Sequence, residues 1–367
     1  MKRFFITLAA LLLIVIVGIG IFVGTTIHRL QEKGAKVEAG LQQWAKDKRD
    51  ITEPYALAQQ VKPALDAGEL KQAETLLDNA LSILDEPAAP KAVLPKHGDS
   101  DLYGNAQAIT IDGYDGQAME PALTADGQTL FFNNEKEASA QTDLHFATRT
   151  GDLNFKYAGK LSGGNGDKLD AIPSIDESGR FYFTSLRSYA ENLQSLYTGK
   201  FNGRELLDLR AVRGDITPKT PGEINMDASV SVDGRQMYIA RARFEPGSVV
   251  PKESDLMLAN IDGYGNFRIA PDSFAQLINV NSDALEYAPA ISADGLELYF
   301  TRAIEGDVPH IMVATRSNTS RPFDAPKALV ALEEFTEAPA TAKDGQEMFF
   351  HKKEGGKYSL FRAVRKK

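Results

Sequence analysis

A short phrase that recurs five times constrains the fold of this chain more than any other feature. Each copy joins a segment of small residues, a turn with glycine and an apolar segment. The copies are EPALTADGQTLFF from Glu120, AIPSIDESGRFYF from Ala171, DASVSVDGRQMYI from Asp227, YAPAISADGLELYF from Tyr287 and EAPATAKDGQEMFF from Glu337. Strand repeats with a period of roughly 40–50 residues are typical of propeller blades. The recurrence therefore predicts a β-propeller.

Each copy supplies the parts of a four-stranded blade. The small residues suit an innermost strand, where several strands converge. The turn needs a positive φ, which glycine accepts without steric cost. The turn glycines are Gly127, Gly179, Gly234, Gly295 and Gly345. A third strand recurs at residues 143, 195, 255, 310 and 359, and weaker fourth strands follow at 154 and 325.

The ends of the repeat region indicate how the ring closes. The chain stops at Lys367, just after the third strand of the last copy, so this blade lacks an outer strand. Residues 106–111, AQAITI, precede the first copy without partners of their own. Pairing this segment with the last blade would remove the exposed edges. We therefore expect an all-β propeller of five four-stranded blades, with six blades as the alternative.

The repeated phrase resembles the β-propeller repeat of the TolB-like family, a WD40-like repeat of periplasmic propellers. Its pattern, Pro-small-x-x-x-Asp-Gly-x-x-apolar-x-Phe, stands at Pro121–Phe132, Pro289–Phe300 and Pro339–Phe350. The resemblance covers residues 103 to 367 and implies a rigid extracytoplasmic ring that binds protein or peptide partners. TolB-like proteins usually have six blades, so no particular partner transfers.

The first residues predict a membrane anchor. After Lys2 and Arg3, the stretch from Phe4 to Gly24 carries no charge, and a membrane-spanning helix needs about 20 residues. A cleaved signal peptide is the alternative, although its apolar core is usually shorter. We expect residues 1–27 to form a single-pass signal anchor in the cytoplasmic (inner) membrane. The propeller would then lie in the periplasm or outside the cell.

Residues between the anchor and the repeats predict a helical segment and a linker. Residues 28–85 show helical periodicity, with a hairpin broken at Asp66-Ala67-Gly68. One part, AGELKQAETLLDNAL, resembles half of a tetratricopeptide unit. Residues 86–102 contain Pro87, Pro90 and Pro95, which favour an extended spacer before the propeller at 103–367.

Composition excludes several classes of function. A net charge of -9 argues against a nucleic-acid-binding face, and the absence of cysteine removes thiolate chemistry and disulfides. The five histidines show no metal-ligand spacing, and no GxSxG motif is present. The segments IDGYDG at 111 and IDGYGN at 261 carry calcium-type ligands, but we interpret them as turns. We expect no cofactor and no metal.

The candidate site is the propeller face opposite the turns. An acid precedes each inner strand, and ring closure would gather these acids around the mouth of the channel; they are Glu120, Asp170, Asp227, Glu286 and Glu337. Basic residues in the loops between second and third strands would form a rim around them; these are Arg187, Arg241, Arg243, Arg302, Lys352 and Lys353. Clustered carboxylates repel one another unless they bind a cation or a basic segment.

Two functions remain open from the sequence. The first is a membrane-anchored binding or scaffolding module of the cell envelope, whose partner is a protein or peptide, or a glycan. It is favoured because architecture explains all the repeated residues. The alternative is a carbohydrate-active, glycosidase-like enzyme with carboxylates in the propeller funnel, which needs two carboxyl groups roughly 5–10 Å apart. A third hypothesis makes the helical hairpin the docking element.

Overall fold

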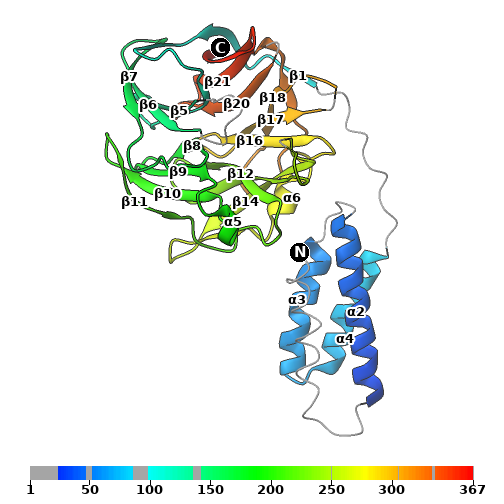
Figure 1. Ribbon diagram of the computed structural model, residues 1–367. Coiled ribbons are helices and arrows are strands. Elements are labelled where there is room, and N and C mark those ends of the chain that lie inside the picture. Colours follow the sequence, from blue (N-terminus) through cyan, green and yellow to red (C-terminus); the bar gives the residue numbers. More distant parts are fainter. Residues whose placement is uncertain are drawn as a thin grey trace. The chain divides into compact units, whose positions relative to one another are not determined.

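The computed structural model describes residues 24–46, 52–85, 98–134, 142–248, 250–304, 306–332 and 335–366. The chain divides into two compact units, Met1–Val93 and Leu94–Lys367. Figure 1 shows helices in the first unit and β-sheets in the second. Each unit has its own hydrophobic core.

The helical unit contains α2 (Gly24–Lys46), α3 (Thr52–Asp66) and α4 (Leu70–Leu84). Its buried core comes from all three helices and includes Val37, Val61 and Leu77. The Trp44 indole N–H donates to the Leu84 carbonyl at 3.1 Å, which ties the ends of α2 and α4 together. The α3–α4 pair is a helical hairpin, as the apolar periodicity predicts, and its likeness to a tetratricopeptide unit stays a prediction.

The predicted membrane location is contradicted by the helices that the structure describes. None of them is both long enough and apolar enough to cross a membrane. Helix α2 begins at Gly24 and carries charged residues such as Arg29 and Lys33, which a hydrocarbon core does not accommodate. The prediction relied on hydropathy over residues 4–24, a stretch that lies outside the described residues apart from Gly24.

Figure 1 shows the β-sheets of the second unit. Two of them have four strands, one has five and one has nine, and most neighbouring strands are antiparallel. Two consecutive sheets are β4 (Met119–Leu123), β5 (Thr129–Asn133), β6 (Leu144–Arg149) and β7 (Asn154–Lys160), then β8 (Asp170–Ile175), β9 (Arg180–Ser185), β10 (Leu196–Phe201) and β11 (Leu206–Ala211). The next strands are β12 (Glu223–Val230), β13 (Gln236–Arg243), β14 (Glu253–Ile261) and β15 (Phe267–Ile269), followed by β16 (Leu285–Ile291), β17 (Glu297–Ala303), β18 (His310–Thr315) and β19 (Lys327–Leu329). A single parallel pair, Ser254 with Leu285, joins these last two groups into one nine-stranded sheet that also includes β1 (Gly98–Ser100), which pairs with β19.

The last sheet joins strands from both ends of the unit. It consists of β20 (Thr336–Thr341), β21 (Glu347–Glu354) and β22 (Lys357–Arg365), with β2 (Tyr103–Ala108) paired to β22. The segment predicted to close the ring, residues 106–111, is divided in the structure. Its first part belongs to β2, while β3 (Thr110–Asp112) pairs in parallel with β7. The connection between β2 and β3 therefore links the last sheet to the first.

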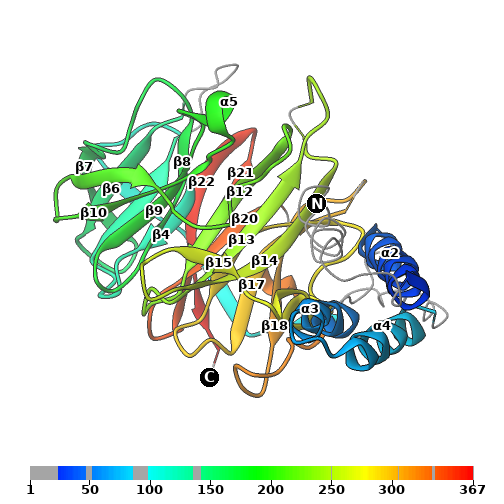
Figure 2. The same cartoon turned by 90° about the horizontal axis from the view of Figure 1, so that it is seen from below.

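The innermost strands of the sheets form a ring. β4, β8, β12, β16 and β20 contact one another in this order, and β20 also contacts β4. Figure 2 shows the sheets of this unit from a second direction. Aromatic side chains of the second and third strands fill the space between neighbouring sheets, for example Phe131 against Phe181 with ring centroids 4.9 Å apart. The predicted propeller fold is confirmed by this arrangement.

The turns after the inner strands have the predicted conformation. All five turn glycines have positive φ, between 67° and 81°. In the fourth copy, the Asp294 carboxylate accepts hydrogen bonds from the Leu296 N–H at 3.0 Å and from the Ser292 hydroxyl at 2.6 Å. In the second copy the serine and the aspartate have exchanged positions: Asp176 comes first and accepts a hydrogen bond from the Ser178 hydroxyl. The turn is therefore kept.

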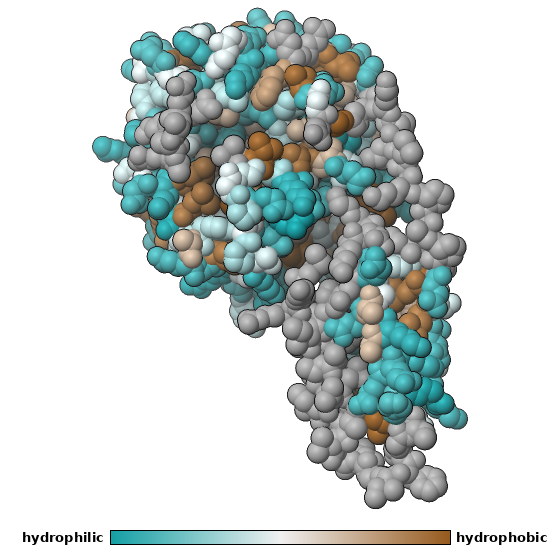
Figure 3. All heavy atoms as spheres, turned by 45° about the vertical axis from the view of Figure 1, so that its right-hand side comes forward, coloured by the Kyte–Doolittle hydropathy of each residue, from teal (hydrophilic) through white to brown (hydrophobic). Residues whose placement is uncertain are grey.

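The surface of the β-rich unit has no extended apolar area on the face seen in Figure 3. Hydrophobic residues form small patches among hydrophilic ones there. Most large apolar side chains of the described residues are buried, and the exposed ones, such as Leu207 and Val330, come from separate elements. Single exposed apolar residues are normal on soluble domains. This face therefore offers no large apolar surface to a partner.

Candidate functional site

A β-bulge in every inner strand sets which side chains face the centre of the ring. The register between first and second strands shifts just before the turn segment in each sheet. In the copies with proline, the residue before it has a positive φ of 48° to 58°; these residues are Glu120, Ile172, Ala288 and Ala338. Asp227 holds the same place in the copy without proline. We call these five the bulge residues.

Each strained bulge residue is held by a side chain of the preceding sheet. A non-glycine residue in the left-handed region costs roughly 1–3 kcal/mol, so it persists only where its surroundings compensate. Here a neighbouring acceptor receives the N–H of each. The pairs are Ile172 N–H to Asn133 Oδ1 at 3.0 Å, Ala288 N–H to Asp227 Oδ2 at 2.8 Å, Ala338 N–H to Thr301 Oγ1 at 3.0 Å and Glu120 N–H to His351 Nδ1 at 3.1 Å.

The bulge residues line a cavity of about 100 Å³ at the centre of the ring. Its walls are mostly small or apolar side chains of the inner strands, such as Ala122, Ala228 and Ala340. The cavity continues toward the turns, where Lys343 borders it. A space of this size is smaller than the roughly 300–1,000 Å³ of typical small-molecule sites.

Glu120 and Asp227 line this cavity, and both interact electrostatically with Glu337; we call these three carboxyl groups the carboxyl cluster. Glu337 is clamped by two donors. The Tyr287 hydroxyl donates to Oε1 of Glu337, and His351 Nε2 lies 3.0 Å from Oε2. Because His351 Nδ1 accepts the Glu120 N–H, a neutral His351 carries its proton on Nε2 and donates it to Glu337.

Burial perturbs the protonation of the other two members. Burial, together with the charges of Asp227 and Glu337, raises the pKa of Glu120 to about 8. Burial also raises the pKa of Asp227 to about 7; the Ala288 N–H opposes this shift and the Glu337 charge adds to it. At neutral pH, Glu120 is therefore mainly protonated, and the Glu337 side chain is fixed by its two hydrogen bonds.

The structure does not bring the remaining two predicted acids into the cluster. Asp170 and Glu286 are fully buried and form ion pairs with Arg187 at 2.5 Å and Arg302 at 2.8 Å. Asn225 takes the equivalent place beside Arg241. These acids lie two residues before the bulge residues, whereas Glu120 and Asp227 are bulge residues themselves. Counting an acid before each phrase overlooked this difference in register.

The basic residues predicted to form a rim are dispersed, because each is engaged by a local partner. Arg187, Arg241 and Arg302 each also donate to a backbone carbonyl of the loop that enters their own sheet, at Gly164, Ile216 and Val280 respectively. Each of these arginines therefore fixes the loop that leads into its own sheet. Arg243 pairs with Glu253 at 2.5 Å, and the Lys352 ammonium lies 5.3 Å from the centre of the Phe361 ring. These five side chains do not form one basic surface.

Sequence reasoning missed three residues of this site. Tyr287 and His351 bind Glu337, and Asn133 holds Ile172 and hydrogen-bonds Glu120. A signal was present: His351 and Asn133 directly follow the apolar second-strand phrase, where the fourth copy has Thr301. The second copy has Thr184 there, so a polar residue at this point in four copies indicates a shared contact.

The chemistry available to the carboxyl cluster is proton transfer or cation binding. A protonated carboxyl beside a hydrogen-bonded carboxylate is the usual arrangement of an acid and base pair. Carboxyl groups whose pKa values are raised also favour a cation that would neutralise them. Among the described residues, no group of three or more His, Asp or Glu side chains is arranged to hold a metal ion.

Fold and site together define a β-propeller with a carboxyl cluster beside its central cavity. No family model and no curated protein matches this sequence, so membership of the TolB-like family stays a prediction. Solved structures with similar folds include the family 117 glycoside hydrolase Zg3597 of Zobellia galactanivorans, with 10% identity, 72% of this chain and 91% of that chain covered, and a TM-score of 0.49. They also include TolB of Acinetobacter baumannii, with 15% identity, 69% and 55% coverage and a TM-score of 0.39.

A third similar structure is the α-L-arabinofuranosidase PaAbf62A of Podospora anserina. Its identity is 12%, the coverage is 73% of this chain and 99% of that chain, and the TM-score is 0.44. Both a TolB protein and glycoside hydrolases are thus among the similar structures. At these identities and scores the likeness assigns no activity.

Proposed function

We propose that the sheets are the five blades of a closed propeller and that the carboxyl cluster binds a positively charged group of a protein or peptide partner. One observation carries this proposal: the partly buried Glu120 and the buried Asp227 have no ion-pair partner among the described residues, although the other buried acids of the inner strands, Asp170 and Glu286, each have an arginine. Buried charges are normally paired.

The size of the cavity supports a single inserted side chain. A cavity of about 100 Å³ is too small to enclose a sugar ring together with its hydroxyl groups, but it accommodates the end of a lysine or arginine side chain. Inserting a cation lowers the pKa values of Glu120 and Asp227, so binding releases protons. Affinity should therefore rise as the pH increases from below 7 to above 8.

The test uses the full chain and two peptides that differ in one side chain, acetyl-Gly-Arg-Gly-amide and acetyl-Gly-Gln-Gly-amide. NMR titration should show binding of the arginine peptide that strengthens about tenfold between pH 6 and 8.5. The variant Glu120→Gln combined with Asp227→Asn should abolish this difference. Asp233→Asn, which removes a charge at an exposed turn, is the matched control. Equal binding of both peptides would contradict the proposal.

A second candidate function is glycoside hydrolysis. It is favoured by one specific observation, the contrast between Glu120, whose pKa is raised to about 8, and the hydrogen-bonded Glu337 beside it. An acid that keeps its proton at neutral pH, next to a second carboxyl group fixed by hydrogen bonds, is the kind of pair that acid–base cleavage of a glycosidic bond uses. Glu120 would protonate the leaving oxygen and Glu337 would act as base or nucleophile, with the sugar at the mouth of the cavity.

Turnover separates this candidate from simple binding. A panel of 4-nitrophenyl glycosides that includes the α-L-arabinofuranoside would be incubated with the full chain. Hydrolysis that falls at least a hundredfold in Glu120→Gln, but stays unchanged in Asp233→Asn, would establish the enzyme. Absence of hydrolysis by the unmodified protein with every glycoside of the panel, together with pH-dependent binding of the arginine peptide, would leave the binding function alone.

A further inference from the structure

A second cavity, of about 270 Å³, lies away from the ring centre between the β8–β11 sheet and strand β15. Three arginines border it: Arg180, Arg210 and Arg213. Thr198 and the turn residue Tyr264 also line it. We call it the arginine cavity. Figure 1 shows β9, β10 and β11, in green, as neighbouring strands of the sheet that forms one wall.

Strand register places the polar side chains of this wall on one sheet face. Thr198 of β10 is paired with Tyr182 of β9 on one side and with Arg210 of β11 on the other. Arg180 lies two residues before Tyr182, so it shares the same face. The opposite face carries Phe181 and Phe183, which pack into the core toward the first sheet. The basic residues therefore face the third sheet.

The hollow exists because the covering strand is short. β15 has three residues, Phe267–Ile269, whereas β11 opposite has six. Phe267 covers part of Tyr182, with ring centroids 5.9 Å apart in an edge-on contact. The rest of the face, including Arg210, stays open to the cavity.

The third arginine is held in place by its backbone. The Phe267 N–H donates to the Arg213 carbonyl at 2.8 Å. At Gly214, an added Cβ would lie 1.7 Å from the Phe267 carbonyl oxygen, and φ is 131°. Only glycine permits so close an approach. This contact fixes the segment that carries Arg213 against β15.

The charge of the arginine cavity is unbalanced. Its lining contains three guanidinium groups and no carboxylate, in a chain of net charge -9. Three neighbouring acids are engaged elsewhere: Asp176 accepts from Ser178 and from the Arg180 N–H, Asp215 accepts from the Ile269 N–H at 3.1 Å, and Asp262 pairs with Arg268 at 3.0 Å. Within the described part of the chain, the three arginine side chains form no ion pair. Such a cluster attracts an anion.

A second observation points to a ligand independently of charge. Thr198 is only 4% exposed, and its hydroxyl has no hydrogen-bond partner among the described residues. An unsatisfied buried hydroxyl costs about 1–3 kcal/mol, so native structures rarely keep one without a purpose. At the rim, Tyr264 is 93% exposed. Its turn is rigid because Asp262 accepts from the N–H groups of Tyr264 and Asn266.

We propose that the arginine cavity binds a small organic phosphate, a phosphomonoester on a group of about the size of a sugar. Three guanidinium groups match the oxygens and double charge of a phosphate better than the two oxygens and single charge of a carboxylate. Thr198 supplies a hydrogen bond that the free protein lacks. The exposed Tyr264 ring provides a surface on which the organic part packs.

Calorimetric titration of the full chain with glucose 6-phosphate tests this proposal, with glucose and inorganic phosphate as further probes. We expect glucose 6-phosphate to bind and glucose not to bind. Arg210→Gln should weaken binding about tenfold or more, whereas Arg204→Gln, at an exposed turn of the same sheet, should leave it unchanged. Tyr264→Ala should weaken the binding of glucose 6-phosphate several-fold and should change the binding of inorganic phosphate little.

A Thr198 variant distinguishes a ligand-binding role of this residue from a purely structural one, because affinity and stability should change in opposite directions. Thr198→Val should lower the affinity for glucose 6-phosphate several-fold and yet raise the melting temperature of the free protein, because it removes an unsatisfied buried hydroxyl. A lower melting temperature would contradict the role given to Thr198. Equal binding by the Arg210→Gln and Arg204→Gln variants, or no binding of either phosphate, would overturn the proposal. Inorganic phosphate binding as tightly as glucose 6-phosphate would overturn the part assigned to the organic group.

Discussion

Arg302 illustrates how one residue of this propeller supports its surroundings. Its side chain is 2% exposed and meets the fully buried Glu286 at 2.8 Å, while a second guanidinium nitrogen donates to the Val280 carbonyl at 2.6 Å. A buried ion pair contributes little net stability, yet removal of one partner leaves an unpaired charge. The pair therefore fixes the entry of the chain into β16 more than it strengthens the core.

We predict that Arg302→Met lowers the free energy of unfolding by about 3–5 kcal/mol, because the buried Glu286 then loses its ion-pair partner and keeps only its hydrogen bonds from Ser282. Urea denaturation followed by circular dichroism would measure this. The matched control is Lys252→Met, which breaks the exposed pair with Glu245 and should change stability by less than about 1 kcal/mol. Comparable losses in both variants would contradict the structural role of the buried pair.

The carboxyl cluster makes stability depend on pH at the residue scale. The pKa of Glu120 is raised by burial to about 8 in the folded state, so the folded protein binds more protons than the unfolded chain between about pH 4.5 and 8. Stability must then fall as pH rises through this range, by at most about 1.4 kcal/mol per pH unit for one group. Glu120→Gln should flatten this dependence in melting curves recorded from pH 5 to 9. An unchanged slope would show that Glu120 is not the titrating group.

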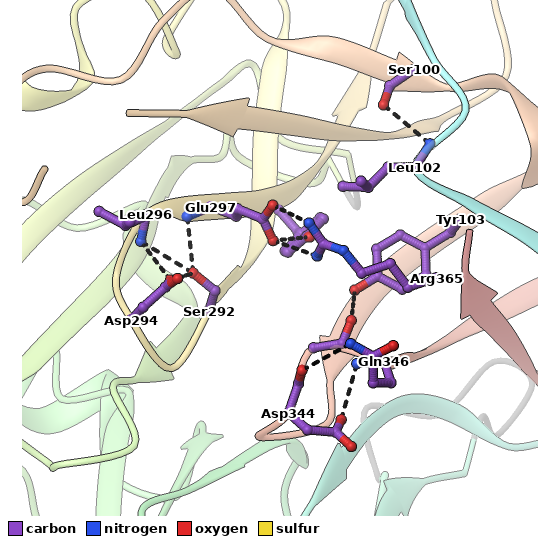
Figure 4. Close-up of polar contacts among 12 residues, drawn as sticks. Ser100, Leu102, Tyr103, Ser292, Asp294, Leu296, Glu297, Asp344, Gln346 and Arg365 are labelled. Carbon is purple, nitrogen blue, oxygen red and sulfur yellow. Dashed lines mark hydrogen bonds and ion pairs between the residues drawn. The ribbon is translucent and has the colours of Figure 1, made fainter. Parts of the chain in front are cut away.

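At the scale of elements, the inner strand and its turn form the repeated unit. The turn glycine and the aspartate before it fix the hairpin, and the bulge before the turn directs one side chain toward the centre. Figure 4 shows the turn of the fourth copy, where Ser292, Asp294 and Leu296 form a local set of hydrogen bonds. Hydrogen bonding by Ser292 holds the pKa of Asp294 below its usual value.

We predict that Asp294→Ala lowers the free energy of unfolding by about 1 kcal/mol, since the Leu296 N–H and the Ser292 hydroxyl lose their acceptor. Asp294→Asn keeps an acceptor oxygen and should cost less. Because the folded pKa of Asp294 is depressed, its ionic contribution is present above the unfolded pKa and disappears as the pH falls through the folded value. The difference between the aspartate and alanine proteins should therefore shrink below about pH 4. A constant difference would contradict this explanation.

At the scale of the whole β-rich unit, polar contacts on the turn face join neighbouring sheets. Arg149 of the first sheet binds Glu347 of the last sheet through two nitrogens, at 2.7 and 2.8 Å. Figure 4 shows the next junction, where Arg365 makes two hydrogen bonds to Glu297. The hydroxyl of Tyr103 donates to the Gly345 carbonyl at the same junction. The first and last sheets are thus joined by strand β2 and by ion pairs.

Loss of the ion pair between Arg149 and Glu347 should lower the stability of the whole ring of sheets. We predict that Glu347→Gln lowers the free energy of unfolding of the β-rich unit by about 1–3 kcal/mol, because the partly buried Arg149 and Arg362 lose their carboxylate partner. Unfolding should remain a single transition when followed by tyrosine fluorescence and by circular dichroism. Glu245→Gln, at an exposed pair, is the control and should have little effect. A local loss of structure without a change in the main transition would contradict a closed ring.

Sequence by itself determined the repeated elements of this protein. Positive φ at a turn and alternation of small and large apolar residues are local requirements, so Gly295 and Phe300 identify their places without knowledge of the fold. The membrane location predicted from hydropathy alone is contradicted, since no described helix is able to cross a membrane. Only the tertiary structure decided which acids share a site. In the sequence, Glu120 and Glu286 both appear as an acid at the start of a repeated phrase. Glu120 is itself a bulge residue and lines the central cavity, whereas Glu286 lies two residues before its bulge residue and pairs with Arg302. Register between strands depends on packing with neighbouring sheets, and for that reason the carboxyl cluster and the arginine cavity became visible only in three dimensions.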